Sequence, residues 1–181
     1  MEQLTLINPE QASEEEAESY PVRKAARAIV FDNEKNVALL HVSKFGYYKL
    51  PGGGVEESED IKTTLQRECK EEIGCEIEVM GEIGSITEYR KIFTLTQISY
   101  CYLAKVKGEK GTPNFDDGEI KEGFKELWLP YDKALGLIIQ NTTSDFEGSK
   151  YIVPRDIIFL EAAKKYISLQ WRNLFPLLKP L

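Results

Sequence analysis

The sequence predicts an α/β or α+β fold in which a mixed β-sheet is packed between helices. Strand-like apolar segments precede, flank and follow one strongly patterned helical segment near the middle of the chain. A length of 181 residues, with 42% hydrophobic and 29% charged side chains, suits one globular domain with a real core. We expect this domain at residues 21–170, between an acidic N-terminal arm at 1–20 and an apolar C-terminal tail at 171–181.

The net charge and the cysteines narrow the class of protein. A formal charge of -7 argues against a duplex nucleic-acid partner, which a basic surface would have to attract. A phosphate-bearing substrate is still compatible, since a bound divalent cation supplies positive charge locally. The three cysteines lack zinc-type spacing, so we expect them to be reduced and buried in a cytoplasmic protein. No secretion signal is recognisable and no apolar stretch approaches the roughly 18 residues of a membrane helix, so no membrane partner is expected.

The N-terminal third is expected to hold an arm, a hairpin and a short extended segment. Residues 1–20 contain many glutamates and few large apolar groups after Ile7, which predicts a frayed arm or a short exposed helix. The apolar runs 25–31 and 37–42, joined by a polar turn, predict a strand hairpin. Residues 47–50 are expected to be extended.

A glycine-rich loop and a capped helix follow. Residues 51–54, Pro-Gly-Gly-Gly, cannot form a helix or a central strand and must make a tight loop. Ser58 is predicted as the helix N-cap, with the acidic residues 59–60 in the first turn. The helix is expected to run to about Ile73 and to stop at Gly74.

The rest of the chain alternates strands, loops and helices. Strands are expected at 77–87, 95–106 and 124–129, and helices at 131–137 and from Pro154 to about Leu169. The polar segments 107–123 and 140–149 are expected to be loops, and the length of the first predicts a functional role. The apolar tail is expected to dock on its own domain, with a subunit contact in a homodimer as the alternative.

The central helix carries three carboxylates on one side. At about 100° per residue, Glu68, Glu71 and Glu72 share roughly one third of the circumference. Ile61 and Leu65 fall on the same side, so the acidic face is expected to point toward the protein or a cleft. The solvent face is expected to consist of Lys62, Thr63, Gln66 and Lys70.

Three inward carboxylates repel one another and raise each other's pKa unless a cation compensates. A hard divalent metal with oxygen ligands resolves this, and Mg²⁺ is the usual ion when phosphates complete its shell. A solvated acidic helix face is the alternative; it suits Glu56 and Glu57 but not the inward three. The glycine loop is either an ordinary turn or a place where backbone groups approach an anion or a metal.

The loop and helix together resemble the signature of a known family. The Nudix box of the Nudix hydrolases (MutT-type domains) is matched at every fixed position by Gly53-x5-Glu59-x7-Arg67-Glu68-Cys69-x-Glu71-Glu72-x-Gly74-Cys75. Cys69 and Cys75 stand where an aliphatic residue is usual, and both are small and apolar enough for that role.

This resemblance implies an α/β/α sandwich and a hydrolase of phosphorus-containing acid anhydrides. The expected reaction is Mg²⁺-dependent cleavage of the diphosphate linkage in a nucleoside diphosphate derivative, such as a nucleoside triphosphate or a nucleotide sugar, with Mn²⁺ as an alternative ion. The metal ligands implied are Glu68, Glu71, Glu72 and the carbonyl of Gly53. Arg67 and Glu59 would orient the acidic cluster.

The general base varies within the family and often comes from a later loop. Glu119 and Glu122 lie in such a loop, and we prefer Glu122; the alternatives are Glu71 or Glu72 on the helix, or a loop whose acids are merely solvated.

Substrate selectivity is expected from other side chains. Aromatic residues that could stack on a base are Tyr48 and Trp128, with Phe45 and Tyr47 as further candidates, and cations that could meet phosphates are Lys49, Arg23 and Arg27. Each aromatic residue has core packing as its alternative, and the single histidine, His41, is expected to be structural.

Two other functions remain open. A ligand-sensing or scaffold domain would keep the fold without turnover, and tight nucleotide binding without hydrolysis would support it. Diphosphate isomerisation on the same fold has no supporting feature beyond the shared helix.

Overall fold

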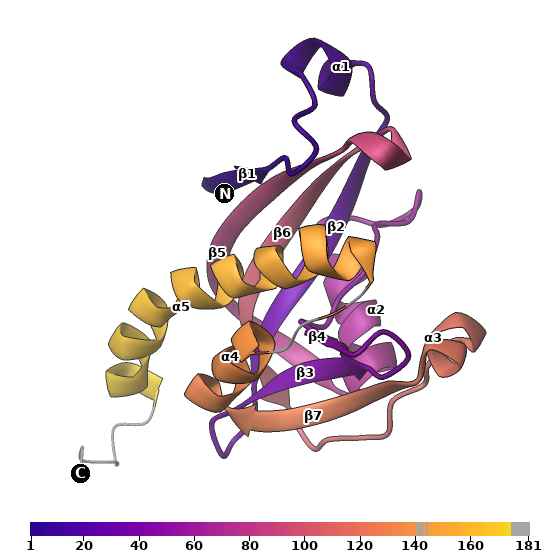
Figure 1. Cartoon of the computed structure of the whole chain (residues 1–181). Coiled ribbons are helices and arrows are strands. Elements are labelled where there is room, and N and C mark those ends of the chain that lie inside the picture. The colour runs from indigo at the N-terminus through magenta and orange to yellow at the C-terminus, as the bar shows by residue number, and fades with distance from the viewer. Residues whose placement is uncertain (141–142, 144, 175–181) are drawn as a thin grey trace.

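The computed structural model describes residues 1–140, 143 and 145–174, and shows a sheet covered by helices on both faces (Figure 1). Seven strands form one mixed sheet in the order β1-β5-β6-β2-β3-β4, with β7 paired to β3. The strands are β1 (Gln3–Ile7), β2 (Val22–Phe31), β3 (Asn36–Val42), β4 (Tyr47–Lys49), β5 (Glu76–Arg90), β6 (Leu95–Lys107) and β7 (Phe124–Pro130). The α-helices are α1 (Glu14–Glu18), α2 (Ile61–Ile73), α3 (Asp117–Glu122), α4 (Tyr131–Gln140) and α5 (Val153–Leu174).

Two apolar cores, one on each face of the sheet, hold the layers together. Helix α2 packs Leu65 and Cys69 against strand residues such as Ala28. Helices α4 and α5 cover the other face, where Ile138 and Phe159 pack with strand residues of a separate cluster (Figure 1). Successive strand residues point to opposite faces, which is why each central strand feeds both cores. The predicted α/β/α sandwich is confirmed.

The N-terminal arm is more ordered than the sequence suggests. Residues 3–7 form an edge strand parallel to β5, so the expectation of a frayed arm is wrong there. Gly84 admits this strand, because a Cβ at Gly84 would lie 2.5 Å from Cγ of Leu4. The short helix is present as α1, where Ser13 and Glu16 form a capping box.

The predicted hairpin at 25–31 and 37–42 is splayed. Strands β2 and β3 are paired only at Phe31 and Val37 in the register of the sheet. Beyond that point the glycine loop takes the place of β3 beside β2. Backbone N–H groups of Ala28 and Ala26 donate to the carbonyls of Pro51 and Gly53, each at 3.0 Å. This opening carries the glycine loop into the middle of the sheet.

Several element boundaries differ from expectation. Asp60, not Ser58, caps α2: its carboxylate accepts from the backbone N–H of Thr63 at 2.7 Å, so residues 59–60 precede the first turn. Gly74 ends the helix in the left-handed conformation at φ 65°, as predicted. Strand β5 continues to Arg90 before a 3₁₀ turn, Lys91–Phe93.

The C-terminal part is more helical than expected. The predicted loop at 107–123 contains α3. Of the predicted loop at 140–149, residues 141, 142 and 144 lie outside the described residues, and a π-helical turn, Gly148–Ile152, leads into α5. The last helix runs to Leu174, and most of the predicted tail, 175–181, is likewise outside them.

Candidate active site

Helix α2 turns its acidic side inward, as its phase predicts. The exposed fraction is 9% for Glu68 and 1% for Glu72, whereas the side chain of Glu71 is 42% exposed at the rim. The predicted solvent face is exposed at each of its four positions, Lys62, Thr63, Gln66 and Lys70.

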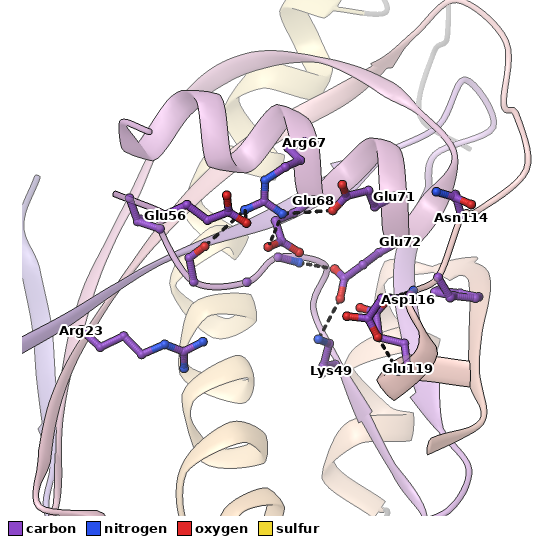
Figure 2. A pocket seen from close by; sticks show the side chains of 15 residues that line it. Arg23, Lys49, Glu56, Arg67, Glu68, Glu71, Glu72, Asn114, Asp116 and Glu119 are labelled. Carbon is purple, nitrogen blue, oxygen red and sulfur yellow. Dashed lines mark hydrogen bonds and ion pairs between the residues drawn. The ribbon is translucent and has the colours of Figure 1, made fainter. Parts of the chain in front are cut away.

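Arg67 forms ion pairs with several carboxylates of the site at once (Figure 2). Its Nη1 donates to Glu68 Oε1 at 2.9 Å and to Glu71 Oε2 at 3.0 Å. Its Nε and Nη2 form a bidentate pair with Glu59 at 2.8 and 3.0 Å. The hydrogen bond from Arg67 holds the pKa of Glu59 at about 2. Arg67 thus connects Glu59 to Glu68 and Glu71, while the orienting role expected for Arg67 and Glu59 stays a prediction.

Glu72 lies at the bottom of the site between two donors. Lys49 Nζ donates to its Oε1 at 2.8 Å, and the backbone N–H of Gly52 donates to its Oε2 at 2.5 Å. Burial raises the pKa of Glu72, and these two donors oppose the rise. The pKa of Glu68 is also raised, first by burial and then by the nearby charge of Glu72. A positive charge in addition to Arg67 and Lys49 would therefore favour the ionised forms of Glu68 and Glu72.

Residues 107–119, the wall segment, form another wall of the site and are attached to the end of α2. The backbone N–H of Asn114 donates to the carbonyl of Glu71 at 2.7 Å, and that of Gly111 to the carbonyl of Gly74 at 2.9 Å. Asp116 caps α3 reciprocally with Glu119. Burial raises the pKa of Glu119.

These elements enclose a cavity of about 650 Å³ (Figure 2). Its wall is mostly polar and joins helix α2, the glycine loop, the segment before α3 and the start of β2. It is lined by Arg23, Lys49, Gly52, Gly53, Gly54, Val55, Glu56, Arg67, Glu68, Glu71, Glu72, Asn114, Phe115, Asp116 and Glu119.

The cavity brings together part of the residue set expected from the sequence. Glu119 lines it, whereas Glu122, the preferred base, is not among its lining residues in the described chain. Asn114 and Asp116 are lining residues that sequence reasoning missed. The pattern Asp116-x-x-Glu119, which predicts a capping box, was the signal that marks this short helix in the sequence.

The aromatic candidates have other roles. Tyr48 stacks on His41 with ring centroids 4.5 Å apart, which agrees with a structural histidine. Trp128 is partly buried against the α2-side core, and its ring is covered by Lys110 Nζ at 3.7 Å from the centroid. Among the described residues, neither Tyr48 nor Trp128 lines the cavity.

Lys110 fastens the start of the wall segment. Besides covering Trp128, its Nζ is 2.5 Å from Oδ2 of Asp32 at the end of β2. Hydrogen bonds from Lys110 and Asn36 lower the pKa of Asp32 against the opposing effect of burial. The segment that carries Glu119 is thus attached both to the β2–β3 turn and to the end of α2.

The donor chemistry suits a hard divalent cation. Arg67 Nη1 lies between oxygens of Glu68 and Glu71, so a positive charge already occupies the place between two carboxylates. A Cβ at Gly53 would lie 2.1 Å from Glu68 Oε1, so the Glu68 carboxylate can lie this close to the loop only because residue 53 has no side chain. In the described part of the chain, no three acidic, histidine or cysteine side chains converge as a ready-made metal site. A metal would have to draw Glu68 and Glu71 away from Arg67.

The predicted ligand Gly53 and the cysteines are also placed. The carbonyl of Gly53 accepts from the backbone N–H of Ala26 at 3.0 Å and from Arg27 Nη1 at 3.1 Å. All three cysteines are buried and unpaired, as expected. No helix in the described ranges combines the length and apolarity needed to cross a membrane.

Solved structures with the same fold include several Nudix proteins. A NUDIX hydrolase from Nitrosomonas europaea is 15% identical, with a TM-score of 0.61, covering 81% of this chain and 90% of that one. A MutT protein from Methanosarcina mazei is 18% identical, with a TM-score of 0.56 over 82% and 97%. An ADP-ribose pyrophosphatase from Streptococcus suis is 19% identical, with a TM-score of 0.51 over 78% and 92%.

The search among curated proteins gives no match. The family description of the NUDIX domain matches residues 21–154, which include the glycine loop, helix α2 and the wall segment. The predicted family and the predicted enzyme class, a hydrolase of phosphorus-containing anhydrides, are confirmed. With this match over most of its length, the chain belongs to the NUDIX domain family.

Proposed function

We propose that the protein is a Mg²⁺-dependent pyrophosphohydrolase that cleaves the diphosphate linkage of a nucleoside diphosphate derivative, with Mn²⁺ as an alternative ion. One observation carries the proposal: two buried carboxylates, Glu68 and Glu72, face a polar cavity of about 650 Å³ in which fixed cations lie beside them. Buried acids with raised pKa values are typical of sites that bind a cation or move a proton.

Glu68, Glu71 and the Gly53 carbonyl would hold the metal, with Glu72 completing the set. A bound divalent ion would neutralise phosphate oxygens and lower the pKa of a bound water. Glu59 would hold the Arg67 guanidinium beside helix α2, and Glu68 and Glu71 would turn from Arg67 to the metal when it binds. Lys49 and the Gly52 N–H would hold Glu72 in its ionised form.

Glu119 is the better candidate for the base that takes a proton from the attacking water. It lines the cavity, and burial raises its pKa, which makes the carboxylate a better proton acceptor. The preference for Glu122 therefore passes to Glu119, with Glu71 and Glu72 as the helix alternatives.

The test is a screen of substrates against matched variants. Nucleoside triphosphates, nucleotide sugars, ADP-ribose, dinucleoside polyphosphates and capped RNA would be incubated with and without Mg²⁺. ADP-ribose comes first, since an ADP-ribose pyrophosphatase shares the fold. Glu72→Gln should abolish metal-dependent product formation, whereas Glu57→Gln, on an exposed residue outside the cavity lining, should leave it intact. If no substrate gave phosphate products in a metal-dependent reaction, the proposed hydrolase activity would be rejected.

A binding domain without turnover is the second candidate. Arg67 and Lys49 already pair with the acidic cluster, so the fold can hold these charges without a metal. Nucleotide binding that is unchanged by chelation, with no hydrolysis, would favour this function.

The setting of the protein is part of the proposal. Three unpaired cysteines support a cytoplasmic location. A small nucleotide-type ligand is the proposed partner, and the homodimer contact through the apolar tail stays a proposal, since most of that tail lies outside the described residues.

A further inference from the structure

Arg23 differs from the other cations that line the cavity. Lys49 pairs with Glu72, and Arg67 pairs with Glu59, Glu68 and Glu71. Across the described ranges, Arg23 has no carboxylate within ion-pair distance. Figure 2 shows it apart from the acidic side chains, across the cavity from helix α2. It is a cation whose charge is not already used by the protein.

A buried side chain holds Arg23 in place. Its Nη1 donates to Gln97 Oε1 at 2.9 Å, and Gln97 is fully buried on β6. The amide nitrogen of Gln97 donates to Glu88 Oε2 at 3.3 Å and to Ser99 Oγ at 3.1 Å. Because both acceptors engage the nitrogen, the amide oxygen has to face Arg23.

The support continues into the core beneath helix α5. Glu88 is fully buried and forms ion pairs with Arg90 and, at 3.5 Å, with Arg155 of α5. Glu88 is therefore fixed as the acceptor that orients Gln97. Arg23, an exposed residue that lines the cavity, is thus held by one hydrogen bond to an amide that buried contacts fix, which reduces the entropy that its side chain would lose on binding a ligand.

Two side chains of opposite charge, Glu68 and Arg23, lie against successive glycines of the glycine loop. A Cβ at Gly53 would lie 2.1 Å from the Glu68 carboxylate, and a Cβ at Gly54 would lie 2.7 Å from Arg23 Nη2. Since neighbouring Cα atoms are about 3.8 Å apart, the acidic cluster and the guanidinium flank adjacent positions of one loop. A ligand lying over this loop meets the cation-binding acids at one end and a free guanidinium at the other.

We propose that Arg23 binds the second phosphoryl group of the substrate, the one across the scissile linkage from the Glu68–Glu72 cluster, and so selects ligands with two linked phosphates. This inference rests on the proposed function for the identity of the scissile linkage. The guanidinium suits this task because its planar fork can give two parallel hydrogen bonds to phosphate oxygens. Arg23 would be a substrate-positioning residue that touches the ligand.

The other two cations considered for phosphates fit less well. Arg27 is buried, donates to the carbonyls of Ala26 and Gly53, and burial lowers its pKa to about 10. Lys49 is occupied by the buried Glu72. Both support the loop and the acidic cluster, whereas Arg23 is the exposed one of the three and has no carboxylate partner within the described contacts.

The test uses binding of probes that need no turnover. Calorimetry with imidodiphosphate, a non-hydrolysable diphosphate, and with orthophosphate, both in Mg²⁺, would compare the whole protein with its variants. Arg23→Gln should weaken imidodiphosphate binding about tenfold to a hundredfold and orthophosphate binding much less, because one charge-assisted contact is lost from the second phosphoryl group. Arg23→Lys should recover part of the loss.

Two variants serve as comparisons. Lys24→Gln removes the same charge from the neighbouring exposed residue of β2, which points to the opposite face of the strand, and should leave both affinities unchanged. Gly54→Ala should reduce imidodiphosphate affinity while Arg23 is retained, because its Cβ displaces the guanidinium. With any substrate found by the screen, Arg23→Gln should raise KM more than it lowers kcat.

The outcomes separate the inference from the proposed function. Equal imidodiphosphate affinity in wild type and Arg23→Gln, or equal weakening of both probes, would overturn the role of Arg23 even in an active enzyme. Selective loss of imidodiphosphate binding supports that role even if the substrate screen finds no hydrolysis. A fall in melting temperature without a change in affinity would mean that Arg23 is structural, and would also overturn it.

Discussion

Helix α2 with its glycine loop and the wall segment at 107–119 line the same cavity, but their conformations have different origins. The helix is capped by its own Asp60, stopped by its own Gly74, and carries its acids at helical spacing. The wall segment is held by distant partners: Lys110 by Asp32, and the Asn114 N–H by the carbonyl of Glu71. Interactions within one element are visible in the sequence, whereas those between distant elements depend on the folded sheet.

The largest expected effect separates Glu119, at the end of the wall segment, from Glu122, which follows that segment. Glu119→Gln should lower kcat about 10²- to 10⁴-fold, because a general base is lost, while Glu122→Gln should stay within about twofold of wild type. Steady-state kinetics on the substrate found by the screen would measure both. A larger loss of kcat for Glu122→Gln than for Glu119→Gln would restore Glu122 as the general base.

A smaller effect is expected from the orienting pair on the helix side. Glu59→Gln should weaken Mg²⁺ affinity about tenfold to a hundredfold, because Arg67 loses its bidentate partner. Metal titration of activity would measure this, with Glu57→Gln as the matched control. Unchanged metal affinity would contradict the orienting role of the pair.

The same variant should change the acid stability of the protein. The folded-state pKa of Glu59 is about 2, below its ordinary value of 4.5, so its stabilising contribution is present above pH 4.5 and is lost as the pH falls toward 2. Thermal unfolding of wild type should lose stability more steeply than Glu59→Gln in that range. Parallel curves would show that the pair is absent in solution.

A still smaller effect tests how the wall segment is attached. Lys110→Met should lower kcat about fivefold, because the ion pair to Asp32 and the contact over Trp128 are both lost and Glu119 is less well placed. Lys110→Arg should recover most of the activity. The fluorescence of Trp128 should change in Lys110→Met, and unchanged fluorescence with full activity would refute the attachment.

The smallest effect concerns the start of helix α2. Asp60→Ala should lower the melting temperature by about 2–4 °C, because the Thr63 N–H loses its acceptor, while Ser58→Ala should have almost no effect. Differential scanning calorimetry would compare them. The reverse ranking would restore Ser58 as the cap.

The fold class, the inward acidic face of α2, its stop at Gly74 and the glycine loop could be predicted from the sequence. Each depends on spacing or conformation within a few residues. The edge strand β1 could not be predicted, because its place depends on a gap beside Gly84 on β5. The role of Trp128 was also hidden, since the Lys110 that covers it is distant in the sequence.

The sequence by itself determined the family and the inward acidic face of helix α2, while the assignment of Glu68, Glu71 and Glu72 as metal ligands stays a prediction. Periodicity and chain-neighbour contacts are local, and they survive in any fold that forms this helix. Only the tertiary structure decided which of Glu119 and Glu122 lines the cavity, and which of its cations has no carboxylate partner among the described residues. Glu119 and Arg23 acquire those positions because strand pairing and the buried Gln97–Glu88 contacts join segments far apart in the chain.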